Sequence, residues 1–177
     1  MAIFRSNHVD ERLLASYRTQ NGETLTDLTA KSSVLLVFLR HFGCTFCREA
    51  VEELAKKRST IESGATRLAF VHLGTEEKAV TFFTPYGLED APRIADPEGK
   101  LYEAFGLVRA DWRQIVNQES ILRMLTAWLN GHFVGLPAGD VQRMPGAFLL
   151  VHGEIRKAFR HKLVSDRPDY LALATAS

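Results

Sequence analysis

The chain has 177 residues, of which 46% are hydrophobic and 24% are charged, and its formal net charge is +1. This composition is typical of a globular protein and excludes a disordered or low-complexity chain. The near balance of 22 basic and 21 acidic side chains argues against dedicated nucleic-acid binding and against electrostatic anchoring to a membrane. Because no apolar run is long enough for a membrane span and the first ten residues lack the features of a secretory signal, we expect a cytoplasmic protein.

The first half of the chain alternates between predicted helices and buried strands. Apolar residues recur at helical spacing over residues 9–17, and a turn at Asn21-Gly22 leads into a short docking segment. Residues 34–39 are continuously apolar, which is typical of a central strand that helices cover on both faces. A long helix is expected over 45–62 and a second buried strand over 67–73. This alternation predicts parallel strands joined by right-handed crossovers.

The second half of the chain predicts shorter elements and a hairpin. In chain order we expect a helix over 76–83 capped by Thr75, a strand over 94–96, a helical turn over 101–105, a helix over 112–130, a loop over 132–143, a hairpin of strands 147–151 and 154–159, and a last helix over 168–174. The hairpin makes the sheet mixed. We therefore expect an α/β protein, a three-layer α/β/α sandwich, in one domain over 1–177 with an N-terminal extension over 1–30 and a helical insertion at about 109–140.

The two cysteines of the chain stand where the most buried strand meets the longest helix, in the motif Cys44-Thr45-Phe46-Cys47. Free backbone N–H groups and the helix dipole stabilise an anion there, so the pKa of a thiol can fall well below its usual value of about 8.5. The spacing places both sulfurs on one side of the first helical turn. We expect Cys44 to be the more exposed, attacking thiolate and Cys47 the more buried thiol that resolves a mixed disulfide.

Four further residues beside the cysteines are candidates for a supporting role. Arg40, His41 and Arg48 add cationic or ionisable neighbours, and Thr45 opens the helix. Two other interpretations of the cysteines remain: small buried apolar side chains, or zinc ligands together with His41. Zinc requires four ligands, and no second pair of Cys or His follows at finger-like spacing, so we expect neither a metal nor a cofactor.

The arrangement of strand, Cys-x-x-Cys and helix resembles the thioredoxin superfamily. Residues 38–49 resemble more closely the peroxiredoxin-like 2 family, whose bacterial members are called AhpC/TSA-type or SelL-related redox proteins, and residues 96–107 resemble a segment of the same family. The resemblance covers roughly residues 22–169. It implies a thioredoxin-like fold, a redox-active cysteine pair with an antioxidant role, and an external thiol reductant such as thioredoxin or glutathione.

The same resemblance draws attention to Met144-Pro145, which precedes an apolar strand. Thioredoxin-like proteins carry a cis-proline at similar spacing beside the active cysteines. The resemblance therefore implies a cis bond between Met144 and Pro145 that faces the cysteine pair and leaves the Met144 backbone free to pair with an extended substrate. The alternative is an ordinary trans proline at the start of a strand.

Several positions depart from the resembled families. If Cys47 stands where peroxiredoxins have their peroxidatic cysteine, Arg40 replaces their proline, Cys44 their Thr or Ser, and Pro145 falls where they have an arginine. The buried carboxylate of thioredoxin would fall on Phe38, which leaves His41 as the nearest titratable residue. We therefore expect a slow reaction with hydrogen peroxide compared with the reaction toward small disulfides.

Three functions compete on these residues. The leading hypothesis is a thiol–disulfide oxidoreductase. The alternatives are a peroxide or organic endoperoxide reductase, and a non-catalytic redox sensor or interaction module, which burial of both sulfurs would favour. The expected partners are a disulfide or peroxide substrate and a thiol electron donor. We expect binding to neither nucleic acid nor a membrane, and the sequence does not decide between a monomer and an oligomer.

Overall fold

The computed structural model describes residues 9–107, 109, 143–163 and 165–175. The helix expected over 112–130, most of the loop expected over 132–143 and nearly all of the insertion expected at about 109–140 lie outside these residues. Within the described part of the chain, no helix combines the length and the apolar character needed to cross a membrane.

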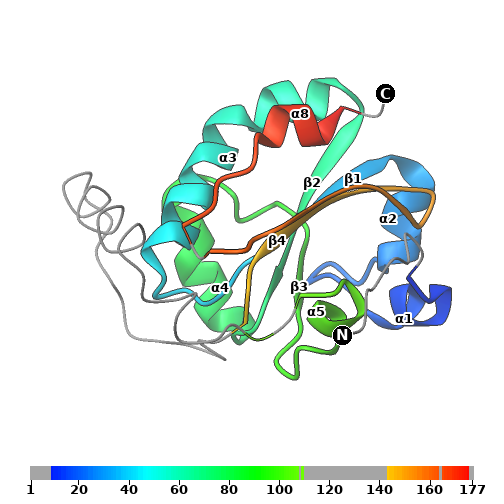
Figure 1. Cartoon of the computed structure of the whole chain (residues 1–177), viewed down its shortest axis with the longest axis horizontal. Helices are drawn as coiled ribbons and strands as arrows, with labels where there is room; N and C mark the ends of the chain where they lie inside the picture. The colour runs from blue at the N-terminus through cyan, green and yellow to red at the C-terminus, as the bar shows by residue number, and fades with distance from the viewer. Residues whose placement is uncertain (1–8, 108, 110–142, 164, 176–177) are drawn as a thin grey trace.

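A mixed five-stranded sheet forms the centre of the molecule (Figure 1). Its strands, in sheet order, are β3 (Arg93–Ala95), β2 (Thr66–His72), β1 (Ser33–Phe38), β4 (Gly146–Val151) and β5 (Glu154–Arg160). β1 pairs in parallel with β2 and β2 with β3, whereas β4 pairs antiparallel with both β1 and β5. The predicted parallel strands and the predicted hairpin therefore both occur. Strand β1 joins them, with the parallel strand β2 on one side and the antiparallel strand β4 of the hairpin on the other.

Helices cover the two faces of this sheet. The helical elements are α1 (Glu11–Ser16), α2 (Leu25–Lys31), α3 (Thr45–Ser63), α4 (Glu76–Phe83), the 3-10 turn η1 (Thr84–Tyr86), α5 (Lys100–Ala104) and α8 (Tyr170–Ala174). Figure 1 shows α3, α4 and α8 on one face and α1, α2 and α5 on the other. The three-layer α/β/α sandwich is confirmed.

Strand β1 is buried on both faces because its side chains alternate between two hydrophobic clusters. Leu35 and Val37 pack with α3, α4 and α8. Val34, Leu36 and Phe38 pack with α1, α2 and α5. A strand with this environment must be apolar at every position, which is why it reads as a continuous run rather than as an alternating one.

Candidate active site

The two cysteines lie where β1 passes through a short loop into α3. Cys44 is the N-cap residue of α3, with an extended backbone, and Cys47 lies in the first turn. The Cys44 N–H donates to the His41 carbonyl at 3.0 Å, and the Arg48 N–H donates to the Cys44 carbonyl at 3.1 Å. Both thiols are free. The structure therefore places both cysteines at the junction between a strand and a helix, as predicted.

The two thiols have opposite acidities. A hydrogen bond from Cys47, the charge of Arg40 and the backbone N–H groups of Cys47 and Phe46 lower the pKa of Cys44 to about 6, against the effect of burial. The hydrogen bond to Cys44, burial and the charge of Cys44 raise the pKa of Cys47 well above its usual value. Near neutral pH this arrangement favours a Cys44 thiolate held by a protonated Cys47.

The expected difference in exposure between the two cysteines is not found. Cys44 is 6% exposed and Cys47 is 4% exposed, so both are buried. Cys47 also accepts a hydrogen bond from the Arg40 N–H, 3.3 Å from its sulfur. Although Cys44 is the N-cap residue, its side chain packs into the same hydrophobic cluster as Phe42 and Tyr170 and is not left at the surface. Burial counts toward a non-catalytic module, whereas the lowered pKa of Cys44 counts toward a nucleophile.

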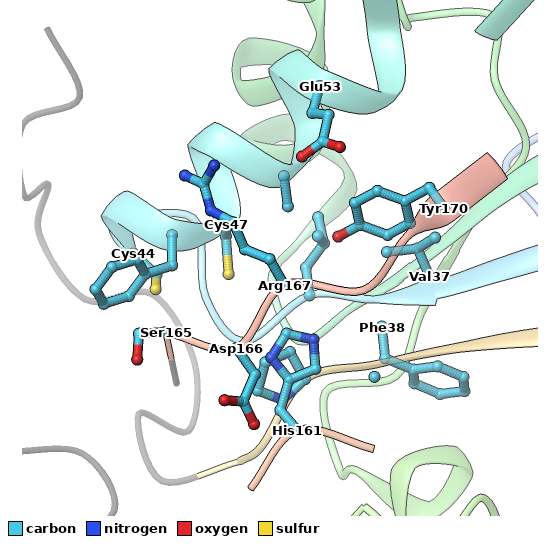
Figure 2. Close-up of a pocket in the computed structure, with 15 residues that line it drawn as sticks. Val37, Phe38, Cys44, Cys47, Glu53, His161, Ser165, Asp166, Arg167 and Tyr170 are labelled. Carbon is cyan, nitrogen blue, oxygen red and sulfur yellow. The ribbon is translucent and has the colours of Figure 1, made fainter. Parts of the chain in front are cut away.

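Both cysteines line a narrow pocket of about 30 Å³, which is room for one or two water molecules (Figure 2). Its wall comes from α3, the end of β1, the beginning of β4 and the segment after β5. The residues that form it are Val37, Phe38, Leu39, Cys44, Phe46, Cys47, Ala50, Glu53, Pro145, Gly146, His161, Ser165, Asp166, Arg167 and Tyr170.

Of the four predicted supporting residues beside the cysteines, Arg40 has a visible effect on the site, since its charge lowers the pKa of Cys44. Burial and the charge of Arg40 lower the pKa of His41 to about 4, so its imidazole is neutral at physiological pH. Arg48 points elsewhere, with its guanidinium 5.9 Å from the centre of the Phe82 ring. Thr45 is buried, and its hydroxyl has no hydrogen-bond partner among the described residues.

The predicted cis bond between Met144 and Pro145 is wrong: the bond is trans. The trans isomer is favoured by about 0.5–1 kcal/mol when nothing opposes it. Here the Pro145 carbonyl accepts a hydrogen bond from the His161 N–H at 3.3 Å, which continues the pairing of β4 with β5 past Gly146. Pro145 does line the pocket, as expected, and Met144 is buried beside it. The expected pairing of the Met144 backbone with an extended substrate depended on the cis bond, so the structure does not support it.

The loop that carries Cys44 rests on aromatic side chains. The Phe42 ring lies 4.7 Å from the Phe82 ring and 5.2 Å from the His72 ring, measured between centres. Before the loop, the Leu39 carbonyl accepts a hydrogen bond from the buried hydroxyl of Tyr102, which also lies 3.1 Å from the Val71 carbonyl. These contacts fix the end of β1 and hence the start of the loop.

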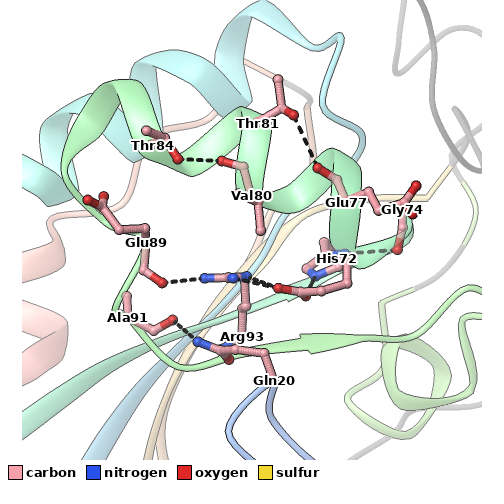
Figure 3. A network of polar contacts seen from close by, with 11 residues as sticks. Gln20, His72, Gly74, Glu77, Val80, Thr81, Thr84, Glu89, Ala91 and Arg93 are labelled. Carbon is pink, nitrogen blue, oxygen red and sulfur yellow. Dashed lines mark hydrogen bonds and ion pairs between the residues drawn. The ribbon is translucent and has the colours of Figure 1, made fainter.

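Behind Phe42, a polar network ties β3 to α4 and to the N-terminal segment (Figure 3). The buried Arg93 side chain donates to Glu76 at 2.8 Å and to the Glu89 carbonyl at 2.7 Å. Gln20 accepts from the Arg93 N–H at 2.8 Å, and His72 contacts the Gly74 carbonyl at 3.1 Å. The network is structural, because it pairs a desolvated guanidinium with a carboxylate and backbone oxygens.

Sequence reasoning missed several residues of the pocket. Glu53 follows Cys47 and Ala50 at intervals of three, so helical spacing gave a signal for it. His161, Arg167 and the other residues after β5 lie more than 110 positions from Cys47, and nothing in their local pattern indicates that they return to it. Among the described residues, no cluster of three or more potential metal ligands forms.

Comparison with known proteins gives the family context of this site. The AhpC/TSA antioxidant enzyme family matches residues 53–163, a range that begins after Cys47. The prostamide/prostaglandin F synthase of Salmo salar is 27% identical over 185 residues, covering 100% of this chain and 88% of that protein. The chloroplastic thioredoxin-like protein AAED1 of Arabidopsis thaliana is 25% identical over 112 residues, which are 63% of this chain and 44% of that protein.

Solved structures with the same fold include peroxiredoxins. Peroxiredoxin Q of Xanthomonas campestris superposes with a TM-score of 0.61 at 14% identity, covering 88% of this chain and 87% of that chain. Peroxiredoxin 6 of Arenicola marina superposes with a TM-score of 0.63 at 10% identity, covering 90% and 67%. A putative thiol:disulfide interchange protein DsbE from Chlorobium tepidum superposes with a TM-score of 0.52 at 17% identity, covering 81% of this chain and 80% of that chain. At these identities the likeness concerns the fold, which is thioredoxin-like.

Proposed function

Because the chain belongs to the AhpC/TSA antioxidant enzyme family, we propose that it is a thiol-dependent oxidoreductase in which Cys44 attacks and Cys47 resolves. The observation that carries the proposal is the opposite acidity of the two thiols: the pKa of Cys44 is lowered to about 6 and that of Cys47 is raised. A thiolate is the nucleophile in thiol–disulfide exchange, so Cys44 is the sulfur prepared to react.

In the first step, the Cys44 thiolate attacks one sulfur of a substrate disulfide. A bond forms between Cys44 and that sulfur, the substrate disulfide breaks, and the second substrate sulfur leaves as a thiolate with the electron pair. Attack requires the Cys44 sulfur to be negatively charged, which the Cys47 hydrogen bond, Arg40 and the N-terminus of α3 favour.

In the second step, Cys47 loses its proton to the departing thiolate or to water and attacks the Cys44 sulfur. The Cys44–Cys47 disulfide forms, and the first substrate sulfur leaves as a thiolate. The negative charge of Cys44 is one cause of the raised pKa of Cys47. That charge disappears when Cys44 enters the mixed disulfide, so Cys47 becomes easier to deprotonate when it is needed. An external dithiol or two glutathione molecules return the two electrons.

The size of the pocket favours a second candidate, the reduction of a peroxide. Its volume of about 30 Å³ admits a molecule the size of hydrogen peroxide without rearrangement. The Cys44 thiolate would attack one oxygen, the O–O bond would break, and the other oxygen would leave as hydroxide or alkoxide. Cys47 would then condense with the Cys44 sulfenic acid, releasing water and forming the same disulfide. The relatives from Salmo salar and Xenopus tropicalis are both named prostamide/prostaglandin F synthase. With these names in view, we include organic endoperoxides among the substrates of this second candidate.

Single cysteine variants test the order of attack. Cys47→Ser treated with stoichiometric oxidised glutathione should accumulate a stable glutathione adduct on Cys44, detected by mass spectrometry of the intact protein. Cys44→Ser should accumulate much less adduct, because burial still raises the pKa of Cys47 and limits access to its sulfur when Cys44 is replaced. Adducts on the second variant alone would reverse the two roles.

Wild-type protein distinguishes the remaining alternatives. Faster formation of the Cys44–Cys47 disulfide with hydrogen peroxide than with oxidised glutathione would favour the peroxide reductase. Cysteines that stay reduced with both oxidants would favour the non-catalytic module. A cytoplasmic location is part of the proposal, because a reducing compartment keeps the pair as thiols between turnovers.

A further inference from the structure

We propose that the segment Ser165–Asp169, called the strap below, selects by size which oxidants reach Cys44, and that the ion pair between Arg167 and Glu49 holds it closed. The strap lies between β5 and α8. The proposal rests on the proposed role of Cys44 as the attacking thiolate. It makes Glu49 and Arg167 determinants of substrate specificity, not catalytic residues.

The strap forms one wall of the cysteine pocket. Ser165, Asp166 and Arg167 line the pocket together with both cysteines, and Ser165 is 1% exposed (Figure 2). The strap thus runs over the first turn of α3 without being part of a helix or strand. A wall built this way can move without unpairing the sheet.

Contacts at each end anchor the strap. At one end, the Asp166 carboxylate accepts hydrogen bonds from the N–H groups of Lys162 at 2.7 Å and of Leu163 at 2.9 Å. At the other end, the buried Tyr170 side chain packs into the same hydrophobic cluster as Cys44 and Cys47. Each of these contacts fixes the strap where it begins or ends.

The middle of the strap is joined to α3 by the Arg167–Glu49 ion pair. The Glu49 side chain is 11% exposed, whereas the Arg167 side chain is 50% exposed. Arg167 lines the pocket that holds both sulfurs, and Glu49 lies in α3 two residues beyond Cys47, so the ion pair links the wall of the pocket to the helix that carries the cysteines. Breaking it removes a side-chain link between the strap and the helix that carries both thiols.

The closed strap has different consequences for small and large oxidants. The pocket of about 30 Å³ holds a molecule close to the size of water. Attack on a disulfide requires its sulfur to approach the Cys44 sulfur in line, with the rest of the substrate accommodated beside it. A disulfide therefore needs the strap displaced, whereas hydrogen peroxide does not. Weakening the ion pair should favour large reagents selectively.

Two alkylating probes of different size test this idea in the Cys47→Ser background, where Cys44 is the remaining thiol. Iodoacetamide is small and a pyrene maleimide is large, and both are neutral. We expect E49Q and R167Q each to increase the ratio of the maleimide rate constant to the iodoacetamide rate constant by up to about fivefold, the range of a partly exposed ion pair.

The two substitutions separate access from electrostatics. E49Q removes a negative charge near Cys44 and R167Q removes a positive one, so an effect through the pKa of Cys44 would have opposite signs in the two variants and would be the same for both probes. K56Q is the matched control, because it breaks the Lys56–Glu52 ion pair on the exposed side of the same helix, and the ratio should stay unchanged. The charge-swapped variant E49R/R167E should restore the original ratio.

Unchanged ratios in E49Q and R167Q, or changes of opposite sign, would overturn the strap proposal. Alkylation requires no disulfide exchange, so this result does not depend on the proposed function. If the protein shows the expected ratios but never forms the Cys44–Cys47 disulfide, the strap proposal is supported and the proposed oxidoreductase function is contradicted.

Discussion

At the scale of single residues, the difference in acidity between Cys44 and Cys47 arises from their surroundings and not from their exposure. Both sulfurs are buried, yet the pKa of one thiol is lowered and that of the other is raised. Spacing and position in the sequence pointed to Cys44 as the attacking thiolate, on the expectation that it would be the more exposed of the two cysteines. They were insufficient to predict burial, because burial depends on residues after β5 that are distant in the sequence.

Arg40 provides a test of this acidity. Arg40→Met removes a positive charge that lowers the pKa of Cys44. We expect the midpoint of the pH profile for Cys44 alkylation by iodoacetamide to rise from about 6 by about one pH unit. Arg40→Lys keeps the charge and should keep the midpoint near that of the wild type. Equal midpoints in the methionine variant and the wild type would contradict a role for Arg40 in stabilising the thiolate.

At the scale of elements, the sequence was most informative where packing imposes a simple period. The strands β1 and β2, the long helix α3 and the hairpin of β4 and β5 all lie within two residues of their predicted bounds. Helix α2 was underestimated as a docking segment, although the Thr24-x-x-Asp27 spacing carries a capping box that the structure contains. The trans bond at Pro145 shows the opposite failure: a family resemblance was extended to a backbone isomer that this chain does not adopt.

The loop between β1 and α3 yields a prediction at this scale. A Cβ atom at Gly74 would lie 2.5 Å from a ring carbon of Phe42, so Gly74→Ala must push that ring and the loop behind it. We expect a loss of about 1–3 kcal/mol in the free energy of unfolding, measured with urea, and a changed alkylation rate at Cys44.

The variant Phe42→Leu tests whether the Phe42 ring is the cause of the stability loss expected for Gly74→Ala. Phe42→Leu removes the ring atoms that the new methyl group would meet. The double variant should therefore lose less stability than the sum of the two single losses. If the stability losses of the two single variants add up in the double variant, the effect of Gly74→Ala does not arise from contact with the Phe42 ring.

At the scale of the whole molecule, three partly or fully buried histidines make stability depend on pH. Burial lowers the pKa of His41, His72 and His161 to about 4 each. An unfolded chain binds protons at these positions below about pH 6.5, whereas the folded chain does not until about pH 4. Stability is therefore fully present above pH 6.5 and is lost as the pH falls toward 4.

Chemical denaturation at pH 7 and pH 5 measures this loss, which should amount to roughly a few kcal/mol in total. His72→Gln should reduce the difference between the two pH values, because His72 is 1% exposed and is neutral in the folded state. His152→Gln is the matched control at an exposed histidine and should leave the difference unchanged. Stability that is equal at both pH values would show that these histidines are protonated in the folded state.

The order of the strands also bears on how copies of the chain can associate. In the described part of the chain, the sheet ends in β3, which has three residues, and in β5, which carries the exposed charged residues Glu154, Arg156 and Arg160. Short strands and charged side chains at the rim of a sheet oppose its continuation into a neighbouring molecule and so protect against fibre-like aggregation. We expect any oligomer of this protein to form through its helical layers or loops and not by extension of the sheet.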